Sequence, residues 1–395
     1  AYSPALQAML FEGAARSADA TQSARLPNPI FTFERLLRRE DAGTEKEITR
    51  MLSFSVFDVL LLPARLRAAD YQQRQLRLDA AGTLIQVAAD ARRAWVVAVA
   101  AQQSAVYATQ VKDAADASAE LARRMQSVGN FSKLQRAREQ AFYADAVASL
   151  ARSQHAARAA REALVRVLGL DPAQAARLTL SERLPDLPAV ADDEAVAART
   201  ALDERLDVRM ARAELEYLAA QLGLTRVTSY VDGLHLAGVR VSESGLPPKK
   251  GFELELPLPI FDFGDARRAS AEASYMAALN RVAMVGVQAT SQVRESYGAY
   301  RTTYDIARHY RDEVVPLRKT IADEMLLKYN GMLIGVFDLL ADSRTQIASV
   351  IQSIEASRDF WLADAALRAA LVGRPMAGVA MEMKSAPAAS GGGGH

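Results

Sequence analysis

The sequence predicts an α+β protein in which two pairs of strands are set between very long helices. Three observations lead to this fold class. They are long alanine-rich stretches with almost no glycine or proline, two short segments in which apolar and polar residues alternate, and a repeat that relates the two halves of the chain. Half of the 395 residues are hydrophobic, yet only 7% are aromatic. Small side chains at that density suit helices packed closely side by side and do not suit one globular core.

The chain has a formal net charge of +1, with acids and bases interspersed, and it contains no cysteine. This balance gives no electrostatic reason to expect nucleic acid as a partner. Without cysteine there is no disulfide framework and no thiolate metal site. No run of about 18 apolar residues is present, which argues against a transmembrane helix but leaves open strands that alternate.

Landmarks recur along the chain at an offset of about 203 residues, which is typical of an internal duplication. Phe57-Asp58 matches Phe261-Asp262, and Tyr71 matches Tyr275. The predicted first repeat covers residues 1–190, with a strand hairpin at 30–61 and a helical hairpin at 64–168. The second covers residues 191–375, with a strand hairpin at 224–261 and a helical hairpin at 265–372, and a disordered tail is predicted at 376–395.

The first repeat opens with a short helix over residues 1–24, which Leu26-Pro27-Asn28-Pro29 ends. Strands are predicted at Ile30–Arg38 and Ile48–Leu61, around a polar turn, because residues of the second strand alternate in character. A helix of roughly 60 residues then runs from Pro63 to about Met125, on the order of 90 Å long.

The turn between the first two long helices is predicted at Gly129-Asn130-Phe131-Ser132. Ser132 and Gln135 fit a capping box, with a side-chain oxygen at the N-cap and an amide three residues on. The helix that follows is predicted to end at Leu168, before Gly169.

The second repeat is predicted to begin with a helix from Asp192 to about Leu222, followed by strands at Leu224–Val241 and Phe252–Phe261. In the second of these strands, Phe252 and Leu254 face one way and Glu253 and Glu255 the other. This alternation fits two readings equally: one face on a soluble core, or one face toward lipid and one toward a wet lumen.

The last two helices are predicted from Asp265 to Leu327, with a kink at Pro316, and from Val336 to Val372. Two glycines, Gly331 and Gly335, are expected to let the backbone reverse between them without steric strain. Apolar residues surround that reversal, which indicates that a partner docks there.

Four strands per chain are too few to close a barrel, and an open sheet in a membrane would leave backbone edges unpaired. If these strands lie in a membrane, several chains must therefore share one barrel. The long helices must likewise pack as coiled coils within and between chains. A barrel continued by a helical tube would form a duct.

Four motifs occur in order along the chain. They are Leu26-Pro27-Asn28-Pro29, Leu256-Pro257-Leu258-Pro259-Ile260-Phe261-Asp262-Phe263-Gly264 with Ala266-Arg267-Arg268, Val314-Val315-Pro316, and Tyr329 followed by Asp338-Leu339-Leu340-Ala341. Through these motifs the chain resembles the TolC-like outer-membrane efflux proteins over about residues 1–375. In this family a glycine usually stands three residues after the tyrosine, at the place that Met332 occupies here.

The resemblance implies an α+β membrane protein that closes as a homotrimer, with a transmembrane β-barrel continuous with a helical barrel in the periplasm. It implies a passive exit duct in the bacterial outer membrane, without cofactor or catalysis, that works with a periplasmic adaptor protein and an inner-membrane pump. The exported cargo would be small molecules or metal ions. The alternatives are a duct for type I protein secretion or, in a different class, a soluble coiled-coil scaffold.

The resemblance also implies that Asp338 lines the periplasmic entrance, where three copies would form a negative ring that concentrates cations. Asp342 and Gln135, the latter at the matching place of the first repeat, are the other entrance candidates. A plainer interpretation places Asp338 in the first turn of its helix, where a carboxylate interacts favourably with the helix dipole and stabilises the helix.

Two further sets of residues are candidate sites. The adaptor-docking candidates are the two turns: Gly129, Asn130, Phe131, Ser132, Gly331, Leu333, Ile334 and Gly335. Glu253 and Glu255 are expected to face a barrel lumen. No metal site is predicted, because the four histidines have no ligand spacing, and no catalytic constellation is apparent.

Overall fold

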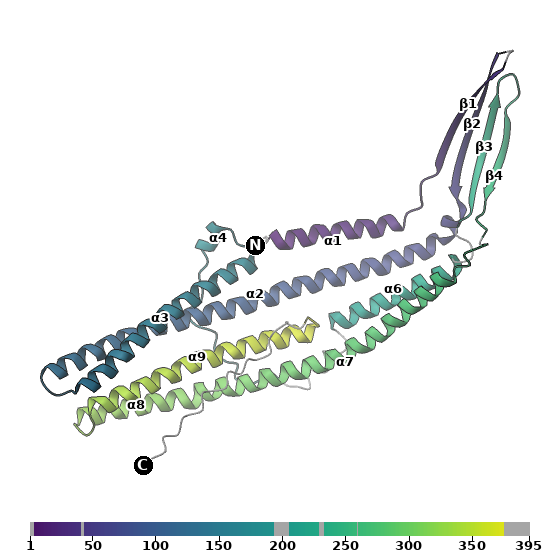
Figure 1. Ribbon diagram of the computed structural model, residues 1–395. Coiled ribbons are helices and arrows are strands. Elements are labelled where there is room, and N and C mark those ends of the chain that lie inside the picture. Colours follow the sequence, from purple (N-terminus) through teal and green to yellow (C-terminus); the bar gives the residue numbers. More distant parts are fainter. Residues whose placement is uncertain (1–3, 41–42, 193–204, 229–232, 259, 375–395) are drawn as a thin grey trace. The chain divides into compact units, whose positions relative to one another are not determined.

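The computed structural model describes residues 4–40, 43–192, 205–228, 233–258 and 260–374 (Figure 1). The chain divides into two compact units, each built from parts of both predicted repeats. The sheet unit comprises Pro4–Thr83 and Leu202–Gln288, and the tip unit comprises Leu84–Ala201 and Ala289–His395 with the first three residues of the chain. The tail predicted at 376–395 lies outside the described residues.

The sheet unit contains one antiparallel sheet of four strands in the order β1-β2-β3-β4 (Figure 1). The strands are β1 (Ile30–Glu40), β2 (Gly43–Ser55), β3 (His235–Glu243) and β4 (Lys249–Glu255). The central pair, β2 and β3, joins the two predicted repeats through regular antiparallel pairing. Helices α1 (Pro4–Ser23) and α6 (Leu206–Thr228) belong to the same unit, with the first parts of α2 (Val56–Ser127) and α7 (Asp265–His309).

The register sorts the side chains of the sheet into two faces, because paired residues point the same way. We call the first the apolar face; its large hydrophobic residues are Phe31, Phe33, Leu37, Ile48, Leu52, Phe54, Leu236, Phe252 and Leu254. Most of these side chains are open to solvent, with Phe252 81% and Phe31 63% exposed, whereas Ile48 and Leu236 are half-buried. The polar face carries Glu253 and Glu255 beside small residues such as Ser53 and Ala237. The residues that the structure describes therefore build no soluble core over the apolar face, which was one of the two interpretations of the alternation.

The predicted end of the second strand is wrong, because β2 stops at Ser55 and α2 begins at Val56. Ser55 acts as a helix cap, since its Oγ accepts a hydrogen bond from the N–H of Asp58 at 3.2 Å. Asp58 also forms an ion pair with Arg65 one to two turns later. Pro63 therefore lies inside α2 and does not precede it.

The strands of the second repeat also differ from prediction. Helix α6 extends to Thr228 and includes Leu224, which was predicted as the start of a strand. Strand β4 starts early, at Lys249, which pairs with Val241, so residues predicted as a turn belong to the ladder. It ends at Glu255, two residues before Pro257, which has no N–H to continue a ladder.

The tip unit contains the remaining parts of α2 and α7, and α3 (Lys133–Leu168), α4 (Pro172–Ala176), α8 (Val315–Asn330) and α9 (Val336–Val372). The predicted kink at Pro316 takes the form of a π-helical turn, η1, over Tyr310–Val314. Pro316 has no N–H to donate to the carbonyl four residues earlier. The helix accommodates this with a wider turn, in which the N–H of Val315 donates to the carbonyl of Tyr310.

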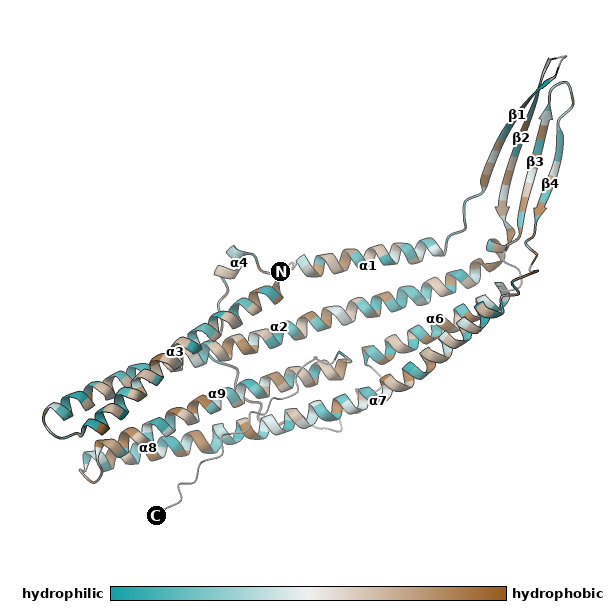
Figure 2. Cartoon of the chain, viewed as in Figure 1, coloured by the Kyte–Doolittle hydropathy of each residue, from teal (hydrophilic) through white to brown (hydrophobic). Residues whose placement is uncertain are grey.

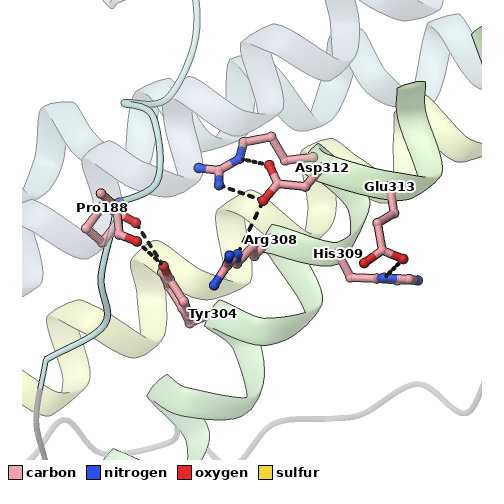
Figure 3. Close-up of polar contacts among 8 residues, drawn as sticks. Pro188, Tyr304, Arg308, His309, Asp312 and Glu313 are labelled. Carbon is pink, nitrogen blue, oxygen red and sulfur yellow. Dashed lines mark hydrogen bonds and ion pairs between the residues drawn. The ribbon is translucent and has the colours of Figure 1, made fainter. Parts of the chain in front are cut away.

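The core of the tip unit holds the segment that connects the two repeats. Tyr300, Tyr304 and Phe360 are at most 1% exposed and pack together, with ring centroids 5.5 to 6.5 Å apart. The hydroxyl of Tyr304 donates to the carbonyls of Pro188 at 3.0 Å and Ala189 at 3.1 Å (Figure 3). Burial raises the pKa of Tyr300, so the hydroxyl of Tyr300 stays neutral in the core.

Polar contacts support the π-helical turn close to this core (Figure 3). Arg311 donates two hydrogen bonds to Asp312, at 2.6 and 3.0 Å, and Arg308 donates a third at 3.3 Å. The hydrogen bond from Arg311 is the largest cause that lowers the pKa of Asp312. His309 pairs with Glu313 at 3.2 Å in the same turn.

In the part of the chain that the structure describes, none of the helices combines the length and the apolar character needed to cross a membrane.

Candidate functional site

The candidate site lies at the two turns of the tip unit, between α2 and α3 and between α8 and α9. Both helices that enter a turn end in the same way. After α2, Asn130 N–H donates to the carbonyl of Met125 at 2.9 Å and Gly129 N–H to that of Gln126 at 3.0 Å. This is a Schellman motif with Gly129 in the left-handed region, at a φ of 84°.

The turn after α8 repeats this geometry with a different residue. Leu333 N–H donates to the carbonyl of Lys328 at 2.8 Å, and Met332 N–H to that of Tyr329 at 3.0 Å. The residue in the left-handed region is Met332, at a φ of 56°, whereas Gly331 and Gly335 have φ values of −79° and −80°. The prediction that Gly331 and Gly335 let the backbone reverse without steric strain is therefore wrong. The residue in the left-handed region is Met332, which lies between them.

The N-termini of α3 and α9 are also capped alike. The predicted capping box of α3 is present: Ser132 Oγ accepts from Gln135 N–H at 3.2 Å, and Gln135 Oε1 accepts from Ser132 N–H at 2.7 Å. At α9 the N-cap is Gly335, which has no side chain, so only the second bond forms. Asp338 Oδ2 accepts it from Gly335 N–H at 3.3 Å.

Two of the entrance candidates, Gln135 and Asp338, are thus placed in the first turns of α3 and α9, and Asp342 lies one turn further along α9. Asp338 is exposed, whereas Gln135 and Asp342 are half-buried. Asp338 stabilises its own helix end, as the plainer reading of the sequence expected. This does not occupy the whole carboxylate, because one oxygen accepts a single long hydrogen bond. The ring of three copies stays a prediction.

The two turns meet through an apolar cluster. Phe131, Val336 and Ala122 are buried there, with Met125, Phe337 and Leu340 packed against them. The rings of Phe131 and Phe337 have centroids 6.2 Å apart. Phe131 is only 8% exposed, because it joins the two hairpins, so little of its side chain is open to a partner. The docking role of the two turns stays a prediction.

Other apolar residues of the turns remain uncovered. Met332 is 92%, Leu333 76% and Val128 70% exposed. Ile334 is half-buried. The exposed side chains come from both turns, so the end of the tip unit presents an apolar surface whose main members are Met332, Leu333 and Val128. Of these, only Leu333 was singled out from the sequence as a docking residue.

Sequence reasoning missed a buried polar network behind the turns. Glu139 on α3 is 1% exposed; its carboxylate accepts from Ser118 Oγ at 2.6 Å and from Arg344 on α9 at 2.7 Å. The guanidinium of Arg344 also lies over the ring of Phe142, 4.4 Å from its centroid. Nothing local marks Glu139 as buried, because it sits in a charged stretch and its partners come from α2 and α9.

Within the described residues, no group of three or more histidine, aspartate or glutamate side chains is placed to hold a metal ion. Glu253 and Glu255 are both exposed on β4 of the sheet unit. They share the polar face, as the alternation predicted.

No protein-family model and no curated protein matches the chain. Solved structures do match it across nearly its full length. The outer-membrane channel OprN has a TM-score of 0.76 at 18% identity, covering 94% of this chain and 87% of that one. The outer membrane protein VceC of Vibrio cholerae has a TM-score of 0.75 at 17% identity, covering 94% and 93%. The CmeC outer membrane channel of Campylobacter jejuni has a TM-score of 0.77 at 14% identity, covering 94% and 83%.

The fold of this chain is therefore that of the TolC-like channels, with long helices and a four-stranded antiparallel sheet. The resemblance seen in the sequence motifs is confirmed at the level of the fold.

Proposed function

We propose that three copies of this chain form a passive channel through a bacterial outer membrane, which serves as the exit duct of a tripartite efflux system. The shared fold over 94% of the chain supports this, and so does the exposed apolar face of the sheet. A soluble protein rarely leaves so many aromatic and aliphatic side chains uncovered on one surface. In lipid they would be in their preferred solvent.

Closure by three copies follows from the edges of the sheet. Strands β1 and β4 are the two edges, and along its outer side each has backbone groups that no described strand pairs with. In a bilayer such groups cost several kcal/mol each, roughly, so β1 of one copy must pair with β4 of the next. The polar face, with Glu253 and Glu255, then lines the lumen, and the apolar face meets the lipid.

The duct needs no reaction of its own, so energy for export would come from an inner-membrane pump reached through a periplasmic adaptor. The helical tip unit would lie in the periplasm. The chain does not by itself select a cargo among drugs, metal ions and secreted proteins.

Extraction and conductance test this function. The protein should leave the membrane fraction only with detergent, run as a trimer, and form ion-conducting pores in planar bilayers. A monomer in the soluble fraction would instead support a coiled-coil scaffold.

Asp338 would line the periplasmic entrance as a ring of three carboxylates that binds divalent cations. Asp338→Asn removes the charge but keeps an oxygen for the N–H of Gly335, so the helix cap survives. We expect divalent-cation block of the conductance to weaken in this variant. Asp323→Asn, on the exposed surface of α8, is the matched control and should leave block unchanged. Unaltered block in Asp338→Asn would remove Asp338 from the entrance.

The adaptor would dock on the apolar end of the tip unit, where Met332, Leu333 and Val128 are exposed. Burying one such side chain in an interface is worth about 1.5–3 kcal/mol. Leu333→Asp should therefore weaken adaptor binding at least about tenfold while the isolated trimer conducts normally. Leu317→Asp is the control, because Leu317 is 61% exposed on α8, away from the turn. Equal loss of binding in both variants, or in neither, would refute docking at the turns.

A further inference from the structure

The charged residues of the sheet are sorted by face. Among the described side chains of the sheet, six glutamates lie on the polar face: Glu34, Glu45, Glu47, Glu243, Glu253 and Glu255. The apolar face carries six cations and, within the described side chains of the sheet, no acid: Arg35, Arg39, Lys46, Arg50, Arg240 and Lys250. Among the lysines and arginines of the sheet that the structure describes, only Arg38 and Lys249 lie on the polar face.

Three of these cations form a row across neighbouring strands. Arg50 on β2 is directly opposite Arg240 on β3, and Arg240 is directly opposite Lys250 on β4. We call this the cationic row. Like charges in directly opposed positions are about 5 Å apart at Cβ and destabilise a sheet. All three side chains are exposed, and none makes an ion pair with a described residue.

The cationic row borders the hydrophobic part of the same face. Leu52 on β2, Gly238 on β3 and Phe252 on β4 each lie two residues from the row along their own strand. On the other side of the row the same face carries three more cations, Arg35, Arg39 and Lys46, together with Leu37 and Ile48, and the strands continue toward the β1–β2 and β3–β4 turns, where Figure 2 shows many hydrophilic residues. The face is thus mainly hydrophobic on one side of the row and mixed, with more cations than large hydrophobic residues, on the other.

This order matches one leaflet of a bilayer, in which hydrocarbon gives way to phosphate. We propose that the cationic row binds the phosphate groups of anionic lipid headgroups in the leaflet at the turn end of the sheet. Phosphate oxygens accept hydrogen bonds from several donors at once, and arginine presents a bidentate fork to them. A headgroup phosphate between Arg50 and Arg240 would turn their mutual repulsion into a shared attraction. The proposal rests on the membrane placement of the sheet proposed above.

The test uses the full trimer in phosphatidylcholine nanodiscs that contain a small fraction of diphosphorylated lipid A. Native mass spectrometry counts the lipid A that stays bound. Each cation near an anionic surface strengthens binding about fivefold, so Arg50→Gln/Arg240→Gln should weaken retention about 25-fold. Arg50→Lys/Arg240→Lys keeps the charge and should retain most of the binding.

Arg38→Gln/Lys249→Gln is the charge-matched control, because it removes two cations from the polar face. It should retain lipid A like the wild type, and dephosphorylated lipid A should not be retained by any variant. Equal loss from both glutamine pairs would overturn the proposal, because net charge alone would then explain binding. So would displacement of lipid A by an equal concentration of inorganic phosphate, which would indicate a site for free anions.

The two proposals fail differently. If the wild-type trimer enters nanodiscs and conducts but shows no preference for lipid A over phosphatidylcholine, only the headgroup site is refuted. If the wild type does not enter nanodiscs, both proposals fall.

Discussion

Met332 occupies the position of the second turn where glycine is the least strained residue. Its φ is 56°, and an L-residue in the left-handed region costs about 1–2 kcal/mol relative to the right-handed one. Gly129 holds the equivalent position of the first turn. The side chain of Met332 is 92% exposed, so packing within the chain does not offset the strain. A contact outside the chain, such as the adaptor proposed above, is the simplest reason for a side chain here.

We expect Met332→Gly to stabilise this turn by about 1 kcal/mol. The amide protons of Met332 and Leu333, which bond to Tyr329 and Lys328, should then exchange roughly fivefold more slowly if they exchange by local opening. Gly129→Ala is the mirror experiment and should speed exchange at Asn130. Faster exchange in Met332→Gly would show that the methionine side chain stabilises the turn after all.

At the scale of the elements, Glu139 and Arg344 connect the two helical hairpins of the tip unit. The side chain of Glu139 is 2% exposed, and that of its ion-pair partner Arg344 is 34% exposed. Removing the cation leaves the carboxylate buried with only Ser118, which typically destabilises a protein by about 3 kcal/mol. Arg344→Met keeps a long, flexible apolar side chain, but it removes the guanidinium and with it the cation–π contact with Phe142.

We therefore expect Arg344→Met to lower the free energy of unfolding by about 3 kcal/mol, measured by chemical denaturation in detergent. Adding Glu139→Gln should recover more than half of this loss, because a neutral amide is far less unfavourable in that site. Additive losses in the double variant would show that the two residues act independently.

Some ends of helices and strands can be predicted from the sequence, and others cannot. The ends of α3 and α9 were predicted correctly, because local chemistry fixes them: Ser132 caps one, and Gly169 and Gly373 end them in left-handed conformations. The end of β2 was predicted wrongly, because the alternation of polar and apolar residues continues into the residue that caps the next helix. Ser55 looks like one more polar strand residue until its bond to Asp58 is seen.

Burial was harder to predict than structure. Phe131 and Glu139 lie within nine residues of each other, and both are buried by helix α9, some 200 positions away in the chain. A pattern in this turn and in α3 alone cannot say which of these residues α9 covers. The apolar turn was therefore predicted as a docking surface with Phe131 in it, whereas the exposed residues are Met332, Leu333 and Val128.

At the scale of the whole molecule, the proposed channel requires that neighbouring residues of β4 meet opposite environments. Phe252 is 81% exposed on the apolar face, and Glu253, the next residue, lies on the polar face. If the sheet closes into a membrane barrel, Phe252 contacts lipid and Glu253 contacts water in the lumen. Arginine placed on the lipid face at the middle of a bilayer costs about 2–4 kcal/mol, whereas arginine in a lumen changes selectivity.

Phe252→Arg should therefore lower the fraction of protein that inserts into bilayers as trimer, although by less than an arginine at the middle of the bilayer would, because Phe252 is only two residues from Lys250 of the cationic row. Glu253→Arg should insert like the wild type and move the ion selectivity of the pore toward anions, because each trimer exchanges three negative charges for three positive ones at the lumen wall. The two variants change adjacent residues of one strand to the same side chain, so strand propensity and net charge cannot explain opposite outcomes. Normal insertion of Phe252→Arg together with failure of Glu253→Arg would mean that the faces are assigned the wrong way round. Failure of both would place neither face in a lumen, and the sheet would then have to pair with something other than copies of itself.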